Sequence, residues 1–157
     1  MAVTVDYGFK LTATETLSSV DGVTTATLIH DAFNEVATLS GSSAPAVSLV
    51  YEKLIALTAG AYTINLASLT GSNGVAQDAT GLRVQLIRVK NLGANAMTFS
   101  EGASNGIALA CGTFIVPAGG IVQMFLNDAS PDVASGDRTI DVAGTGTQTF
   151  ELSIYAG

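Results

Sequence analysis

Hydrophobic and polar residues alternate through the first part of the chain. From Val3 to Ala13 every odd-numbered residue is hydrophobic, and every even-numbered residue is polar, charged or glycine. A period of two is typical of a β-strand with one apolar face, because successive side chains point to opposite sides of a strand. Asp21-Gly22 predicts a two-residue hairpin turn, since glycine tolerates the positive φ of such turns. The Thr-rich residues 23–29 would then form the returning strand.

Residues 30–39 fit two different elements. Four hydrophobic positions have the spacing of one short helix: Ala32, Phe33, Val36 and Ala37. A strand is the alternative for the same residues. The loop at residues 41–45, rich in Ser with Gly and Pro, marks a boundary between an N-terminal arm or hairpin at 1–45 and a body at 46–157. The length fits one domain, residues 1–157.

From residue 46 onward, strand patterns alternate with turn signals. Residues 47–57 are hydrophobic on both parities, which fits a strand buried on both faces or one containing a bulge. In residues 82–91 the hydrophobic parity changes partway, from Leu82, Val84 and Leu86 to Ile87 and Val89. Such a switch predicts a bulge, or a corner where the strand passes between sheets.

The other strand patterns of the body are short. They cover residues 62–66, 97–99, 114–116, 121–126, 140–142 and 150–154. Eight or nine short strands at a spacing of roughly ten residues, with turn residues between them, are typical of a sandwich or barrel. We therefore expect an all-β chain that forms an antiparallel β-sandwich, with at most one short helix near residues 30–39.

One long stretch contains no charged side chain. Residues 102–127 have no Asp, Glu, Lys or Arg, and much of the stretch is apolar enough to suggest a membrane span. However, Pro117-Ala118-Gly119-Gly120 interrupts it, as does Gln123, and the flanking charges are Glu101 and Asp128. Two buried strands joined by a turn explain the same residues, and we expect these rather than a membrane segment.

Composition and charge exclude several classes of protein. Charged residues make up 12% of the chain and hydrophobic residues 48%, which is the opposite of a disordered composition. The net charge of −7 disfavours nucleic acid and anionic membranes as partners. Arg83, Arg88 and Lys90 form a local group of cations, but no interleaved aromatic residues accompany it. The N-terminus lacks the basic start and apolar block of a signal peptide.

Patterns that could carry catalysis are weak. Gly102-Ala103-Ser104-Asn105-Gly106 matches the G-x-S-x-G pattern, but that motif needs a strand-to-helix turn and a histidine later in the chain. Here a β-type run follows, and the only histidine, His30, lies upstream. Cys111 is the only cysteine, and its apolar neighbours predict a buried structural thiol. Gly144-Thr145-Gly146 lacks the third glycine and the helix of a phosphate-binding loop. We expect no catalytic residue and no cofactor.

An acidic loop is the candidate for a metal. Asp128, Asp132 and Asp137, with Asn127 and Ser130 nearby, could offer oxygen ligands to Ca²⁺. The order of an EF-hand fails, because Val133 stands at the position of the turn glycine and Thr139 at that of the bidentate glutamate. We interpret the segment as a solvated loop and assign no metal ligand, with calcium binding as the alternative.

Several short sequence segments resemble those of small β-rich virion structural proteins of tailed bacteriophages. They lie in residues 55–157, at 57–60, 64–71, 81–85, 91–93, 102–106 and 143–146. The resemblance implies a jelly-roll or related sandwich that decorates or cements a capsid, or less often builds part of a tail or tail tube. It brings no catalytic residue with it, and it does not cover residues 1–45. It also implies a virion protein whose partners are capsid or other virion proteins, and the missing signal-peptide pattern leads us to expect synthesis in the host cytoplasm.

The charge pattern independently favours self-association. Six basic and 13 acidic side chains are few for the surface of a free monomer of this length. The strand at residues 3–13 also has a long edge without protection, which a neighbouring subunit's sheet would cover by strand addition. Pairing within its own sandwich is the alternative. We expect a non-enzymatic, self-associating protein, with a trimer favoured; a carbohydrate-binding sandwich assisted by calcium is the alternative function.

Overall fold

A computed structural model describes residues 3–10, 13–17, 26–30 and 34–157. Within these ranges every regular element is a β-strand, and the strands pair antiparallel in five sheets. The predicted all-β, antiparallel sandwich is confirmed. No helix long and apolar enough to cross a membrane occurs in the described ranges.

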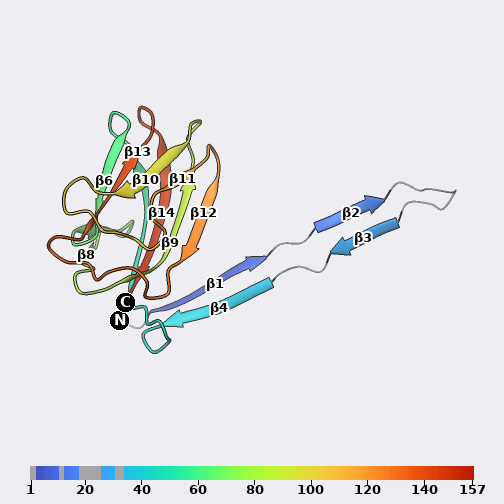
Figure 1. Cartoon of the computed structure of the whole chain (residues 1–157), viewed down its shortest axis with the longest axis horizontal. Helices are drawn as coiled ribbons and strands as arrows, with labels where there is room; N and C mark the ends of the chain where they lie inside the picture. The colour runs from blue at the N-terminus through green and yellow to red at the C-terminus, as the bar shows by residue number, and fades with distance from the viewer. Residues whose placement is uncertain (1–2, 11–12, 18–25, 31–33) are drawn as a thin grey trace.

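Two four-stranded sheets form the sandwich (Figure 1). One sheet has the order β12-β9-β14-β5, and the other has the order β11-β10-β13-β6. The bounds are β5 Leu49–Ala56, β6 Ala61–Asn65, β9 Val84–Asn91, β10 Met97–Glu101, β11 Phe114–Val116, β12 Ile121–Phe125, β13 Thr139–Ala143 and β14 Thr149–Ala156. Two short strands, β7 (Leu69–Thr70) and β8 (Ala76–Gln77), pair with each other in the connection between β6 and β9.

The body folds as one long antiparallel ribbon. Its first strand pairs with its last, β5 with β14, and the next pairs inward are β6 with β13, β9 with β12, and β10 with β11. Successive pairs alternate between the two sheets, and the contacts of β9 with β14 and β10 with β13 complete each sheet. The uncharged stretch forms β11 and β12, so the prediction of two strands joined by a turn is confirmed.

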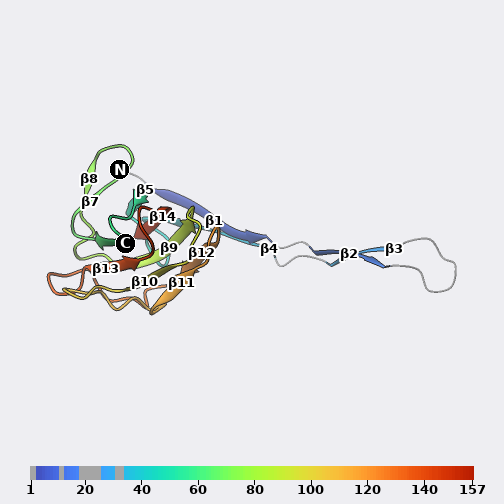
Figure 2. The same cartoon turned by 90° about the horizontal axis from the view of Figure 1, so that it is seen from above.

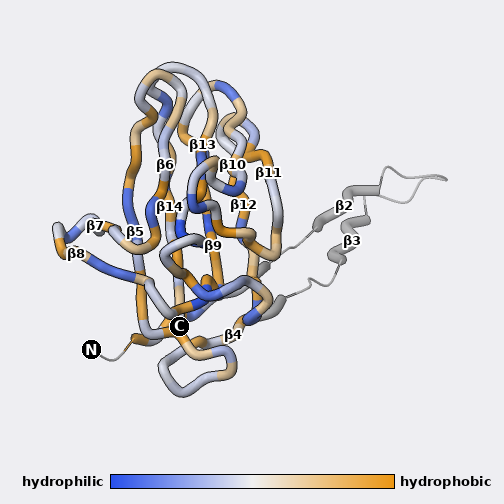
Figure 3. The backbone as a smooth tube through the Cα atoms, turned by 60° about the vertical axis from the view of Figure 1, so that its left-hand side comes forward, coloured by the Kyte–Doolittle hydropathy of each residue, from blue (hydrophilic) through white to orange (hydrophobic). Residues whose placement is uncertain are grey.

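The core lies between the two sheets. Phe99 of β10 is fully buried, stacks on Phe114 at a centroid distance of 5.1 Å and meets Phe150 edge-on at 5.4 Å. The alternating hydrophobic residues of the last two strands are also buried: Ile140, Val142, Phe150, Leu152 and Ile154. Figure 3 shows hydrophobic residues recurring along the strands of both sheets, as the alternation of inward and outward side chains requires.

The parity change in residues 82–91 has a local cause. The register between β14 and β9 shifts between Tyr155 and Ala156, so that β9 carries one extra residue, Gln85. The predicted bulge is therefore present, whereas the strand does not pass between sheets. After the bulge Leu86 shares the outer face with its partner Tyr155, yet it is only 2% exposed. Its burial on an outer face requires a further layer.

That layer is the base of the N-terminal hairpin. Strand β1 (Thr4–Lys10) pairs with β4 (Asn34–Ser40) in seven Cα pairs, and β2 (Ala13–Leu17) pairs with β3 (Ala26–His30). Figures 1 and 2 show β2 and β3 continuing the line of β1 and β4 away from the sandwich. We call residues 4–40 the hairpin.

The short helix considered near residues 30–39 is wrong for the part that the structure describes. Residues 34–40 are a strand, because the backbone groups of β4 find partners along the whole length of β1. The predicted strand at 3–13 is present as β1 and the start of β2, and the returning strand is present as β3. The turn at Asp21-Gly22 and residues 31–33 lie outside the described ranges.

The buried phenol of Tyr51 gives a test of the core by pH. Burial raises the pKa of Tyr51 from 10.0 to about 12, and the nearby Tyr62 adds to the shift. Between these pKa values the unfolded chain loses the proton while the folded chain keeps it, so the free energy of unfolding falls as pH rises. We expect Tyr51→Phe to remove about 2 kcal/mol of this fall. Urea unfolding at a series of alkaline pH values measures it, and an unchanged pH slope in the variant would contradict the assignment.

Candidate functional surface

The residues considered for catalysis do not form a nucleophile site in the described structure. Strand β10 ends at Glu101, and Ser104 lies in an exposed turn with no helix following it in the described ranges. The Ser104 and Asn105 carbonyl oxygens accept hydrogen bonds from the Thr139 hydroxyl, which fastens this turn to β13. His30 is the last residue of β3, in the hairpin, and its side chain lies outside the description.

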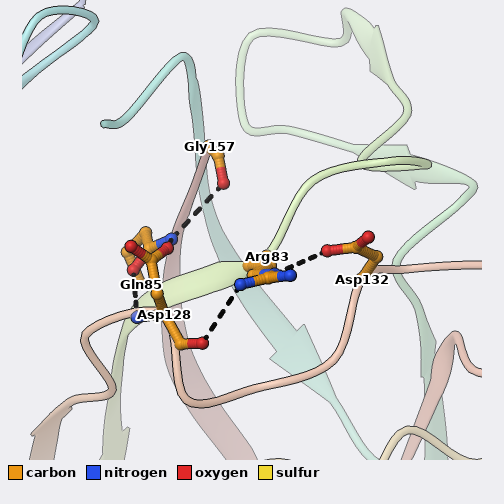
Figure 4. Close-up of polar contacts among 5 residues, drawn as sticks. All are labelled: Arg83, Gln85, Asp128, Asp132 and Gly157. Carbon is orange, nitrogen blue, oxygen red and sulfur yellow. Dashed lines mark hydrogen bonds and ion pairs between the residues drawn. The ribbon is translucent and has the colours of Figure 1, made fainter. Parts of the chain in front are cut away.

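Side chains of this chain form hydrogen bonds to the acidic loop, so its oxygen atoms are not all free for a metal ion (Figure 4). Arg83 Nε donates to Asp132 Oδ1 at 2.6 Å, and Arg83 Nη1 lies 3.4 Å from the Asp128 carbonyl oxygen. The fully buried Gln85 donates from Nε2 to Asp128 Oδ1 and accepts from the Asp128 backbone N–H at 2.9 Å. Asp137 belongs to a separate turn, where its backbone pairs with Ala134. Two of the three predicted carboxylates are therefore hydrogen-bonded by this chain's own side chains.

Gln85 is a structural residue that the sequence analysis missed. Its amide Nε2 also lies 3.3 Å from the Gly157 carbonyl oxygen, so one side chain joins the bulge of β9, the acidic loop and the residue after β14. The signal in the sequence is a polar residue at the point where the hydrophobic parity of the strand changes. Within the described ranges, no group of three His, Cys, Asp or Glu side chains could hold a metal ion.

The three cations at Arg83, Arg88 and Lys90 are partly neutralised by two carboxylates. Arg83 pairs with Asp132, while Arg88 and Lys90 lie 3.8 Å and 4.0 Å from the same carboxylate, that of Glu151. Asp132 raises the pKa of the Arg83 guanidinium through a hydrogen bond and its charge. These cations therefore leave little positive potential with which to attract a phosphate backbone.

Cys111 and the described clefts offer little for small-molecule chemistry. Cys111 is half-buried against the core, and burial raises the pKa of its thiol, which keeps it in the unreactive protonated form. The described clefts have volumes of about 130 to 270 Å³. Ligand pockets usually exceed about 300 Å³.

The hairpin base packs on the outer face of the β12-β9-β14-β5 sheet. Val5, Leu39 and Val47 form a small buried cluster, with Val50 and Tyr155 of the sheet packed against it. Tyr7 of β1 stacks on Phe125 of β12, with ring centroids 5.2 Å apart and planes at 22°. These contacts explain why Leu86 is buried on that face, since it lines the same small cleft as Val5, Tyr7 and Tyr155.

One side of the sandwich carries two sheet edges with no charge. Strand β11 is an edge strand of one sheet and β12 is an edge strand of the other, and both lie in the uncharged stretch 102–127. Ile115 and Ile121 are 60% and 55% exposed, and Phe125 is 39% exposed. Soluble proteins usually protect such edges with lysine, proline or a covering segment. We call β11, β12 and the turn 117–120 the uncharged edge.

Comparison of the chain with protein-family models, with curated proteins and with solved structures found no match. No residue role is therefore carried over from a relative. The hairpin, the uncharged edge and the compensated charges beside them are the features from which a function is argued.

Replacing Gln85 tests its role in holding the acidic loop. We expect Gln85→Met to lower the free energy of unfolding by about 1–3 kcal/mol, because it removes the three hydrogen bonds that the buried Gln85 amide makes to Asp128 and to the Gly157 carbonyl oxygen. The matched variant Asp132→Asn breaks an exposed ion pair that solvent screens, and it is expected to lose clearly less stability than Gln85→Met. Urea unfolding at neutral pH measures both. Equal losses would mean that Gln85 does no more than a surface contact.

Calcium gives a second test of the same loop. Because Asp128 and Asp132 are bound by Gln85 and Arg83, we expect the same unfolding temperature in excess Ca²⁺ and in chelator. A ligand that bound the folded chain at a hundred times its Kd would stabilise it by about 2.7 kcal/mol, which is easily seen in a thermal scan. A calcium-dependent rise in Tm would restore the metal site.

Proposed function

We propose that this chain is a non-enzymatic structural protein of a bacteriophage virion. In this proposal it self-associates and decorates or cements a capsid, with other virion proteins as its partners. The observation that carries the proposal is the uncharged edge: two unprotected sheet edges and three exposed hydrophobic side chains on one side of the sandwich. A surface of this kind is typical of an interface rather than of a free monomer.

The strand order supports the jelly-roll that this function implies. The body is a ribbon of four nested antiparallel pairs, and successive pairs alternate between the two sheets. A ribbon rolled in this way gives the double Greek key of a jelly-roll, an architecture used in capsid proteins and in lectins. Fold alone does not separate these uses, so the choice between them is argued from the surface.

Features of the surface favour the structural use over the carbohydrate-binding one. The acidic loop offered for calcium is held by Arg83 and Gln85. The chain has no tryptophan, so aromatic platforms for sugar stacking are few. The described clefts are also small for a ligand or a substrate. The nearest alternative within the proposal is a tail or tail-tube location.

The mechanism follows from linkage. A protein that binds the assembled shell and not its free subunits stabilises the shell by mass action. Self-association gives each assembly several equivalent contacts with a symmetric lattice, and a trimer is the favoured assembly. Linked contacts raise the avidity well above that of one contact.

Solution mass by light scattering tests the proposal. We expect a closed oligomer, with three copies of the 15.9 kDa chain favoured, at every point of a concentration range of about a hundredfold. An apolar interface should also survive about 1 M salt, where exposed charge pairs are screened. A 15.9 kDa monomer throughout the range would contradict self-association and with it the proposed function.

A further inference from the structure

We propose that the distal part of the hairpin, β2 with β3, adds to the open edge of β12 in a second copy of this chain. The inference rests on the proposed self-association and names the contact that produces it. It requires a donor that lacks a partner, an acceptor edge with free backbone groups, and a reason for the two to belong to different copies.

The hairpin is the donor. In the described ranges each of its four strands pairs with one neighbour only, so that β1-β4 and β2-β3 are two-stranded sheets. A two-stranded sheet is marginally stable in water, and a third strand or a packed face is needed for independent stability. The pair β1-β4 has such a face where Val5, Tyr7 and Leu39 meet the sandwich. Figures 1 and 2 show β2-β3 extending beyond that support.

Strand β12 is the acceptor, and its free groups follow from two hydrogen bonds. Leu126 N–H donates to the Gln85 carbonyl at 2.7 Å, and the Gly120 carbonyl accepts from Asn91 N–H at 2.9 Å, so residues of this parity point toward β9. Alternate residues of a strand point their backbone groups to opposite sides. The N–H and C=O groups of Ile121, Gln123 and Phe125 therefore face the open edge, and no partner for them occurs in the described ranges.

The other edge strands are poorer acceptors. Strand β11 has three residues. The edge of β5 is partly covered, because its Val50 and Glu52 carbonyls accept hydrogen bonds from Gln77 Nε2 and Ser72 N–H. Strand β6 has five residues, but its exposed side chains, Ala61 and Thr63, are small. On β12 the exposed Ile121 and Phe125 would pack against an added strand.

Charge selects this edge for an acidic donor. Residues 4–40 contain five acidic side chains and one lysine, and the whole chain carries −7, so most surfaces of a second copy would repel the hairpin. The uncharged edge presents no like charge to it.

The direction in which the hairpin extends indicates that the acceptor edge belongs to a second copy of the chain. The hairpin is fixed beside β12 by the Tyr7–Phe125 stack and runs outward from there, so β2-β3 lies away from its own β12. The hairpin therefore extends from the same side of the molecule on which the open edge of β12 lies. Each copy can therefore donate its hairpin to the β12 edge of the next copy, and a ring of three copies closes this head-to-tail contact so that no hairpin and no β12 edge is left unpaired.

A proline at the centre of the open edge tests the contact. The N–H of Gln123 points outward, so Gln123→Pro removes a donor that the sandwich does not use, and edge strands tolerate proline at such positions. Gln123→Thr is the matched control, because it changes the same exposed side chain and keeps the N–H. We expect light scattering to give a monomer for Gln123→Pro and the wild-type mass for Gln123→Thr, with both variants folded by circular dichroism.

Hydrogen exchange provides a readout that needs no change in β12. A shortened hairpin is made by replacing residues 11–33 with an Asn-Gly turn, which suits the facing pair Lys10↔Asn34. We expect the amides of Ile121, Gln123 and Phe125 to be protected in the wild-type protein and to exchange fast in the shortened one. The amide of Leu126, which donates to Gln85, should stay protected in both proteins.

The outcomes separate this contact from self-association in general. A wild-type protein that is monomeric overturns both. An oligomeric wild type whose outward β12 amides exchange fast, or whose mass is unchanged by Gln123→Pro and by the shortened hairpin, overturns the hairpin contact and leaves self-association standing. If Gln123→Pro does not fold, the exchange comparison decides alone.

Discussion

The pairing of β5 with β14 is the contact on which the rest of the structure depends. Eight Cα pairs, from Leu49↔Ala156 to Ala56↔Thr149, join the two ends of the body. Every other strand pair of the ribbon lies inside this one. The strands of the two sheets therefore align correctly only when β5 and β14 are paired in their own register. The inward residues of both strands, such as Tyr51, Ile55 and Phe150, then meet the opposite sheet as a single core.

The same pairing forms the surface on which the hairpin base packs. Val50 of β5 and Tyr155 of β14 face each other on the outer side of the sheet and pack against Val5 and Leu39. Tyr155 also donates to Glu52 at 2.8 Å; burial first and then this contact raise the pKa of its phenol. The outer face thus has a hydrophobic half under the hairpin and, beside it, a charged half with Glu151, Arg88 and Lys90.

Local pattern was sufficient to predict the fold class and many of the strands, because alternation reports directly which face of a strand is buried. The parity change in β9 correctly indicated a bulge, but the burial of Leu86 on the outer face depends on a hairpin some eighty residues away in sequence, as Val5 and Leu86 show. The spacing near residue 36 left a helix and a strand both open, and pairing with β1 decides for the strand in residues 34–40, because tertiary pairing outweighs weak local preference. The acidic loop was recognised, but its partner Gln85 was not, since only the bulge brings the two together.

The nested pairing of the strands also implies an order in which parts of the chain can fold. During synthesis the hairpin emerges before the body, but the surface on which it packs includes Tyr155, which lies in β14, more than a hundred residues after β4. Until β14 has closed against β5, the apolar side chains of Val5, Tyr7 and Leu39 have no complete surface to cover, and the uncharged edge has no finished sheet behind it. Long-range strand pairing of this kind is slow to form. The hairpin base can therefore dock fully only on a sandwich that has already closed, so the hairpin takes its final direction after the β5-β14 pair has formed.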